Sequence, residues 1–359
     1  MKTGKTLTEL AQELDRQQKV KKDYLVDTRS LQMGWDNDNF MLGMYDGDYS
    51  SETPLAEFSI NDTAHGQIAS RLSIPVKYYD RMRGNYPELL QENVNGWFRK
   101  NPERRMVRVL DGTARAFLSD SYRRIDNYEI AEAVLPILGE MPDMRVESCE
   151  ITETRMYIKV VNPRLQGEVS KGDIVQSGLV ISNSEVGLGS VKVQPLIYRL
   201  VCLNGMIIND AGVRKYHIGR VNEAGENFEL FSSETLKADD TAFLMKIRDV
   251  TRAAIDEVQF QRVIALMKEA SGAAITTDDI PKMVELATSD YGVSKGESKG
   301  ILDYLIKDGN LSLYGLSCAV TRFSQDVQGY DRATELESIG YDILTMSGNE
   351  WVKLNRAAA

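Results

Sequence analysis

The architecture of this chain follows from four stretches in which apolar and polar residues alternate: MRVESCEI (144–151), RMYIKVVN (155–162), IVQSGLVISNS (174–184) and SVKVQPLIYRLVC (190–202). A period of two places successive side chains on opposite faces of a strand, so each stretch predicts a β-strand. The residues Gly187-Leu188-Gly189 provide a flexible turn between the last two stretches. The sequence therefore predicts a sheet of consecutive strands that pair antiparallel.

Helical patterns lie on both sides of these strands. One helix is expected over 7–22, further helices over 59–98 and after Asn127, and several more beyond about Glu229. The predicted fold class is α+β, with a central antiparallel sheet, flanking helices and an acidic C-terminal helical region. The predicted domains are an N-terminal helix and strand/turn segment (1–62), an α+β core with a basic hairpin (63–225), and a C-terminal helical region (226–359).

Length and composition exclude several classes of protein. The chain has 359 residues, a hydrophobic content of 42% and a formal net charge of −10, which is typical of a globular protein. No apolar run approaches the roughly 18–20 residues that span a bilayer, and the polar N-terminus does not resemble a secretory signal. We therefore expect a cytoplasmic protein. The three cysteines are scattered without a CxxC pair, which argues against a disulfide framework or a zinc site.

A basic stretch interrupts this acidic chain: RKNPERRMVRVLDGTARAFLSDSYRR (99–124). It contains eight basic and three acidic residues. The part around Asp111-Gly112 predicts a β-hairpin, because apolar and polar residues alternate on both sides of a dipeptide suited to a tight turn. A basic hairpin in an acidic protein predicts an anion-binding face.

A second basic segment lies between Lys192 and Arg220, with five basic residues and Asp210 as its one acidic residue. Aromatic residues such as Tyr122 and Tyr198 lie among the charges of the two segments. Arginine beside an aromatic side chain is typical of a single-strand binder, since one contacts phosphate and the other stacks on a base. Ordinary amphipathic strands with aromatic residues in the core give the same pattern.

Other kinds of site have little support in the sequence. No phosphate-binding glycine loop, dinucleotide fingerprint or GxSxG motif is present, and no cofactor is expected. Of the two histidines, His65 lies in a predicted helix and is expected to pack. His217 is surrounded by basic and glycine residues, which suits anion binding or a neutral general base.

Five segments resemble the phage/plasmid-like protein family, which is domain of unknown function 932. They are AHGQIASRLSIPVKYYDRM (64–82), LSDSYRRIDNYEI (118–130), ISNSEVGLGSVKVQPLIYRLVCLNGM (181–206), KYHIG (215–219) and LYGLSCAVTRFSQDVQGYDRATELESIGYDIL (313–344). The resemblance implies a protein of a bacterial mobile element and assigns no activity.

The resemblance places these residues on motif positions: Ser119, Tyr122, Arg123, Asn127, Ser184, Gly187, Arg199, Cys202, Asn204, Gly205 and His217. Two of these positions also have simple structural interpretations. Asn204-Gly205 is a turn signal after a strand, and Arg199 is a candidate partner for a carboxylate of the C-terminal region.

The leading functional hypothesis is a non-enzymatic nucleic-acid-binding protein of a phage or plasmid. Single-stranded DNA is the favoured ligand, in replication, annealing recombination or DNA protection. The residues expected to contact it are Arg104, Arg105, Arg108, Arg115, Tyr122, Arg123, Arg124, Lys192, Arg199, Arg214 and Lys215.

Two alternatives belong to other classes. The residues from Glu229 to Glu350 carry 21 acidic and 12 basic side chains, so these helices could dock on a basic host protein. The other alternative is an enzyme acting on nucleic acid or a nucleotide, with His217 as general base and Glu185 or Asp210 as metal ligand. A homo-oligomer is compatible with the nucleic-acid and protein-partner hypotheses.

Overall fold

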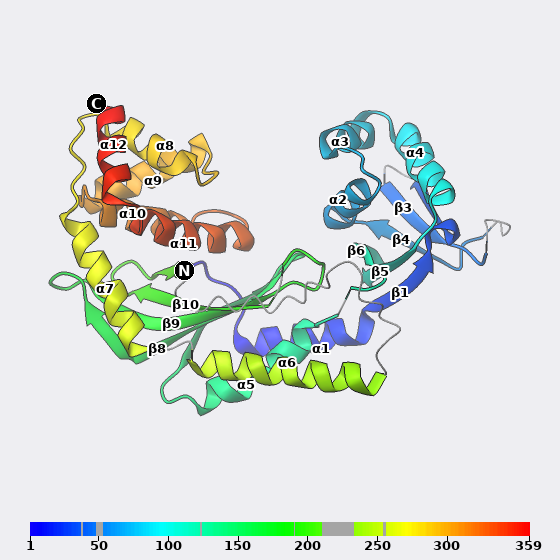
Figure 1. Cartoon of the computed structure of the whole chain (residues 1–359), viewed down its shortest axis with the longest axis horizontal. Helices are drawn as coiled ribbons and strands as arrows, with labels where there is room; N and C mark the ends of the chain where they lie inside the picture. Colours follow the sequence, from blue (N-terminus) through cyan, green and yellow to red (C-terminus); the bar gives the residue numbers. More distant parts are fainter. Residues whose placement is uncertain (37–38, 48–52, 123, 190, 210–232, 254–255) are drawn as a thin grey trace.

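The computed structural model describes the chain except for residues 37–38, 48–52, 123, 190, 210–232 and 254–255. It contains two β-sheets, each with its own helices (Figure 1). The predicted α+β class, with an antiparallel central sheet, flanking helices and a C-terminal helical region, is confirmed. The predicted domain boundary near 225 lies outside the described residues.

The first sheet has six strands in the order β1-β5-β6-β4-β3-β2. Their bounds are β1 Lys22–Asp27, β2 Leu31–Asp36, β3 Asn39–Met44, β4 Ala56–Ile60, β5 Arg104–Leu110 and β6 Thr113–Ser119, with a short 3-10 helix at Thr28–Ser30. Only β4 and β6 pair in parallel among the described strands. The strands on either side of residue 62 therefore join one sheet.

Three helices cover one face of the first sheet: α2 Asp62–Arg71, α3 Val76–Asn85 and α4 Pro87–Lys100. The core between them contains Val107, Val109 and Phe117 from the strands and Met82 and Phe98 from the helices. Burying these apolar surfaces stabilises the layer by removing them from water.

The predicted basic hairpin is confirmed as β5 and β6. Asp111 and Gly112 have φ angles of 50° and 75°, and Leu110 pairs with Thr113 across the turn. Two successive residues with positive φ match the twist of the flanking strands, which is why Asp-Gly is favoured at this position.

The second sheet is antiparallel, in the order β11-β10-β9-β8-β7. Its strands are β7 Arg145–Ile151, β8 Met156–Glu168, β9 Ile174–Asn183, β10 Lys192–Arg199 and β11 Asn204–Ile207. The four predicted strands correspond to β7–β10. The turn interpretation of Asn204-Gly205 was wrong, because Leu203 takes the positive φ of 53° and Asn204 pairs with Arg199 as the first residue of β11.

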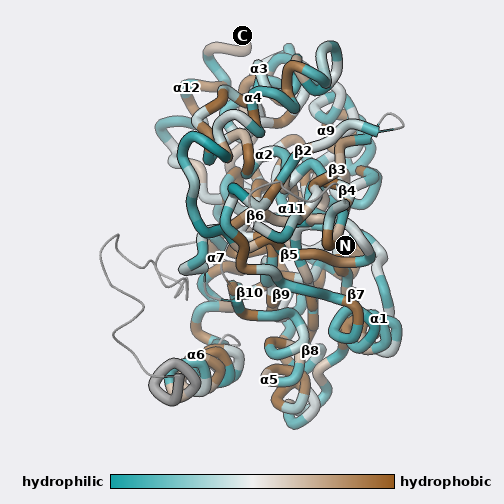
Figure 2. The backbone as a smooth tube through the Cα atoms, turned by 90° about the vertical axis from the view of Figure 1, so that its right-hand side faces the viewer, coloured by the Kyte–Doolittle hydropathy of each residue, from teal (hydrophilic) through white to brown (hydrophobic). Residues whose placement is uncertain are grey.

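Helices cover both faces of the second sheet. On one face, α1 Leu7–Val20, α5 Asn127–Glu140 and α6 Ser233–Ala253 pack over β7–β10. At the other face and one end of the sheet lie α7 Glu257–Gly272, α8 Ile280–Ser289, α9 Lys295–Asp308, α10 Leu313–Phe323, α11 Tyr330–Leu344 and α12 Gly348–Ala358. Teal and brown segments alternate along the strands and helices in Figure 2, as expected for elements that bury one side.

A buried ion pair joins β8 to α11. The side chains of Lys159 and Glu337 are both 0% exposed, and Lys159 Nζ lies 2.6 Å from Glu337 Oε2. Lys159 also donates to Thr334 Oγ1 at 3.0 Å and lies 4.6 Å from the centre of the Tyr330 ring. An unpaired charge at this depth is strongly unfavourable, so each partner depends on the other.

Replacing one partner of this pair is expected to destabilise the protein strongly. Lys159→Met leaves the Glu337 carboxylate buried without its cation, and the free energy of unfolding should fall by about 3–5 kcal/mol. The double variant Lys159→Met/Glu337→Leu should recover most of that loss, because no charge stays behind. Urea denaturation of Lys159→Met, Glu337→Leu and the double variant measures the coupling free energy between the two residues. Additive losses would show that the two charges do not depend on each other.

Candidate nucleic-acid interface

The arginines of the basic hairpin divide between solvent and the protein interior. Arg104 is exposed at the start of β5, whereas Arg105, Arg108 and Arg115 are 9%, 0% and 8% exposed. The period-two pattern of the hairpin suggested a solvated basic face. Both faces of β5 and β6 are covered instead, one by α2–α4 and the other by the turn between β9 and β10.

Arg108 makes the largest set of contacts. Its guanidinium donates to both carboxylate oxygens of Asp23 on β1, at 2.8 and 3.1 Å, and to Asp126 Oδ1 at 2.6 Å. Its Nη1 donates to the backbone carbonyl of Glu185 at 2.9 Å. Burial opposes the charge, but the two carboxylates outweigh it and raise the pKa of Arg108. One arginine thus ties together β1, β5, the start of α5 and the β9–β10 turn.

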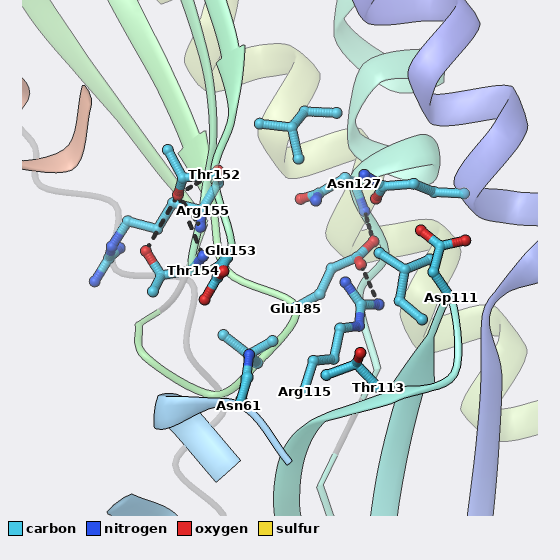
Figure 3. Close-up of a pocket in the computed structure, with 14 residues that line it drawn as sticks. Asn61, Asp111, Thr113, Arg115, Asn127, Thr152, Glu153, Thr154, Arg155 and Glu185 are labelled. Carbon is cyan, nitrogen blue, oxygen red and sulfur yellow. Dashed lines mark hydrogen bonds and ion pairs between the residues drawn. The ribbon is translucent and has the colours of Figure 1, made fainter. Parts of the chain in front are cut away.

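Arg115 forms the second ion pair at this junction. Its Nη2 lies 2.6 Å from Glu185 Oε2, and Glu185 Oε1 accepts the backbone N–H of Asn127 at 2.6 Å. Asn127 is the first residue of α5, so the carboxylate also lies at the positive end of the helix dipole. Figure 3 shows this ion pair, with Arg115 and Glu185 pointing toward one another in the lining of a pocket.

That pocket has a volume of about 200 Å³ and a polar lining. Asp111, Thr113 and Arg115 come from the hairpin, and Thr152–Arg155 come from the turn between β7 and β8 (Figure 3). Glu185 neutralises Arg115, Arg16 neutralises Asp111, and Glu153 offsets Arg155 in the lining. The pocket therefore offers no excess of positive charge to a phosphate.

The other predicted residues near the hairpin also have partners. Arg105 pairs with Glu103 at 2.8 Å and lies over the Phe117 ring. The Nη1 atom of the half-exposed Arg124 lies 3.2 Å from Asp23 Oδ2. Tyr122 donates its hydroxyl to the Ser184 carbonyl at 3.4 Å, so its ring packs at the junction and does not project as a stacking platform.

Two predicted residues lie on β10 in the second sheet. Arg199 donates to both carboxylate oxygens of Asp173, at 2.6 and 3.0 Å, and lies over the Tyr314 ring. Its acidic partner therefore precedes β9 and does not come from the C-terminal region, which corrects the earlier expectation. Lys192 is half-buried at the start of the strand. Arg123, Arg214, Lys215 and His217, together with Asp210 and Arg220, lie outside the described residues.

The geometry therefore does not support a phosphate-binding track along the hairpin. Arg105, Arg108 and Arg115 are buried beside carboxylates, and the half-buried Arg199 is paired with Asp173, so a phosphate would have to displace those carboxylates to reach them. The sequence located the arginines correctly but not their partners, because Asp23 and Glu185 are distant in the chain. Of the described hairpin arginines, Arg104 alone is exposed without an ion pair.

A contrast between two hairpin arginines tests this assignment. Arg108→Gln removes the cation from between two carboxylates, so the free energy of unfolding should fall by about 3–5 kcal/mol. Arg104→Gln should change it by no more than about 0.5 kcal/mol, because the side chain is exposed. Urea denaturation measures both variants. Equally small changes in the free energy of unfolding for the two variants would show that the buried ion pairs of Arg108 do not stabilise the fold.

Two exposed cations without partners among the described residues lie on α3, a helix outside the two basic segments of the sequence. On α3, Lys77 and Arg81 are exposed and one turn apart, so they share one face of the helix. Tyr78 lies beside them and is 47% exposed. The opposite face of α3 packs Tyr79 and Met82 into the core of the first sheet. The sequence VKYYDRMRGN (76–85), read with a helical period, places Lys77 and Arg81 on one face and Tyr79 and Met82 on the other.

Lys77 and Arg81 have no ion pair or hydrogen bond with any residue that the structure describes. In Figure 1, α3 lies at the edge of its helical layer, on the side toward the C-terminal helices. We define the α3 face as Lys77, Tyr78, Arg81 and Asn85, all of which are exposed. It presents two cations and one aromatic ring, the combination that the sequence assigned to the hairpin, and the exposed Asp80 borders it on the side away from Tyr78.

Neither a metal-binding cluster nor a membrane-spanning helix occurs among the described residues. No group of three or more His, Cys, Asp or Glu side chains there is arranged to hold a metal ion. No helix in that part of the chain is long and apolar enough to cross a membrane.

Comparison with known proteins identifies the family and gives no activity. No curated protein and no solved structure matches the chain. The family described as Domain of unknown function (DUF932) matches residues 116–340, from β6 to α11, and the α3 face precedes this segment. Because the match spans more than half of the sequence, the chain belongs to the DUF932 family.

Proposed function

We propose that this protein binds single-stranded DNA through the α3 face. The proposal rests on which basic residues have carboxylate partners and which do not. The buried arginines of the hairpin are held by carboxylates, whereas Lys77 and Arg81 are exposed without a partner among the described residues and lie beside the exposed ring of Tyr78.

This arrangement has the two elements that single-strand binding requires. The ammonium of Lys77 and the guanidinium of Arg81 attract successive phosphates of a flexible strand, and the Tyr78 ring offers an aromatic surface to an unstacked base. Neither cation has to leave an internal carboxylate, so binding does not compete with folding. Two further exposed cations of the same sheet-and-helix unit, Lys100 and Arg104, lie at the end of α4 and the start of β5.

The rest of the chain limits where a strand can lie. The formal net charge is −10, and the acidic C-terminal helices repel a polyanion. The strand is therefore confined to a short contact on the α3 side, and the salt dependence should correspond to few phosphates. The biological setting that we propose is a phage or plasmid in a bacterial cell, in replication, annealing recombination or protection of DNA.

Removing both cations of the α3 face should weaken binding. For Lys77→Ala/Arg81→Ala we expect the affinity for single-stranded DNA at low salt to fall about tenfold, and the slope of log affinity against log salt to shrink by about 1.4. Fluorescence anisotropy of a labelled oligonucleotide over a salt series measures both quantities.

The matched control is Arg262→Ala/Lys268→Ala. It removes one lysine and one arginine that are exposed on a single helix, α7, without ion pairs among the described residues, and it should leave the affinity and the slope unchanged. Equal losses in the two double variants would overturn the α3 assignment. Absence of binding by the unmodified protein at low salt would overturn the proposed function and direct the search to basic proteins that dock on the acidic helices.

The aromatic contact is tested separately from the charge. Tyr78→Ala should lower the affinity about 5- to 100-fold, the range that stacking of one base contributes, without altering the salt slope. Tyr78→Phe keeps the ring and should bind like the unmodified protein. The same anisotropy titration gives both results, and a loss in Tyr78→Phe equal to that in Tyr78→Ala would show that stacking is not the contact.

A further inference from the structure

A hollow adjoins α3 on the side away from Tyr78. It has a volume of about 430 Å³, which is within the range of small-molecule sites. It opens between α3 and the first sheet, near the end where β2 turns into β3. Its lining residues are Trp35, Asn39, Phe40, Ser59, Ile60, His65, Asp80, Arg83 and Gly84.

The sheet side of this hollow is aromatic. Trp35 on β2 and Phe40 on β3 are paired across the two strands, and their ring centres are 4.5 Å apart. Both side chains lie on the sheet face that α2–α4 cover, because Met33 and Leu42, two residues away on each strand, are core residues of that layer. The hollow therefore offers ring surface that suits a flat aromatic ligand.

His65 on α2 supplies a buried polar group to the same hollow. The residue is 2% exposed, and its Nδ1 lies 2.8 Å from the Tyr79 hydroxyl. Its Nε2 has no hydrogen-bond partner among the described residues. Burial, aided by Arg83, lowers the pKa of His65 to about 3, so the ring is neutral at physiological pH. A neutral ring nitrogen of this kind forms one directed hydrogen bond with a ligand.

The α3 side of the hollow has a carboxylate and an open position. Asp80 is exposed without an ion pair among the described residues, whereas Arg83 is paired with Asp62 at 2.7 Å. A Cβ added at Gly84 meets no atom within 4 Å, so the glycine leaves space over the opening. A carboxylate only accepts hydrogen bonds, and it therefore selects ligands that carry N–H groups.

We propose that this hollow holds one base of the bound strand and selects bases whose Watson–Crick edge has an amino group beside an unprotonated ring nitrogen, namely cytosine and adenine. The inference rests on the proposed single-strand binding and adds a composition preference to it. Trp35 and Phe40 contact the ring, His65 Nε2 bonds the ring nitrogen, and Asp80 accepts from the amino group. Thymine is disfavoured, because its carbonyl oxygens flank its single ring N–H and repel the carboxylate.

The position of the hollow suits a strand that lies along α3. Asp80 and Gly84 follow the helix on one side of Lys77 and Arg81, and Tyr78 lies on the other side. A backbone held by the two cations therefore passes between two ring surfaces. One base stacks on Tyr78 in solvent, and another base enters the hollow, where hydrogen bonds distinguish its edge.

The test compares homopolymers of cytosine, adenine and thymine of one length by anisotropy at fixed salt. The unmodified protein should bind the first two about fivefold more tightly than thymine, the scale of one net hydrogen bond. Gly84→Leu fills the hollow and should remove this preference while thymine binding persists. Gly139→Leu is the matched control, because Gly139 is also the next-to-last residue of its helix and also has open space around its Cβ. It should keep the preference.

Asp80→Asn provides a second variant that does not alter the volume of the hollow. The amide adds a donor, so the discrimination against thymine should shrink to less than about twofold. Equal affinity of the unmodified protein for the three homopolymers, or a preference that survives in Gly84→Leu, would overturn the base site and leave the α3 face intact. If none of the homopolymers binds, both the base site and the proposed function fail.

Discussion

The structure depends on one buried guanidinium. Arg108 has no exposed surface and contacts Asp23, Asp126 and the Glu185 carbonyl, which belong to three elements outside its own hairpin. A buried cation is tolerated only where partners surround it. The edge strand β1, the start of α5 and the β9–β10 turn therefore take fixed positions around β5. The same ion pairs that join the two sheets remove positive charge from the surface.

How far the sequence predicted the structure depends on how far apart the interacting residues lie along the chain. The β5–β6 hairpin was predictable, because Asp111-Gly112 and the alternating residues beside it act locally. The role of Arg108 was not predictable, since Asp23 is 85 positions away and Glu185 is 77. A charged residue alternating with valines normally indicates a solvated strand face. Here a turn from the other sheet covers that face, and local periodicity contains no information about it.

The α3 face, in contrast to the contacts of Arg108, is formed by residues close together in the sequence. Its helical period, its two cations and its tyrosine lie within ten residues, so a single helix supplies the whole arrangement. A count of charges obscured it, because Asp80, which borders the face three residues after Lys77, reduces the local net charge. The hollow depends on tertiary structure, since His65, Trp35 and Gly84 come from three elements. Only the fold could bring them together.

Several residues that the sequence resemblance placed on motif positions help to build the junction between the sheets. Tyr122 donates to the Ser184 carbonyl, Asn183 donates to the Asn127 side chain at 2.9 Å, and Leu188 N–H bonds to Ser184 Oγ at 3.1 Å. Gly187 has a φ of 77°, which favours glycine, and a Cβ there would lie 2.6 Å from a methyl carbon of Leu118, so a larger residue would strain the turn and displace that side chain. These residues fix how one sheet meets the other. The segment that the family model matches, 116–340, therefore contains this junction, whereas the α3 face precedes that segment.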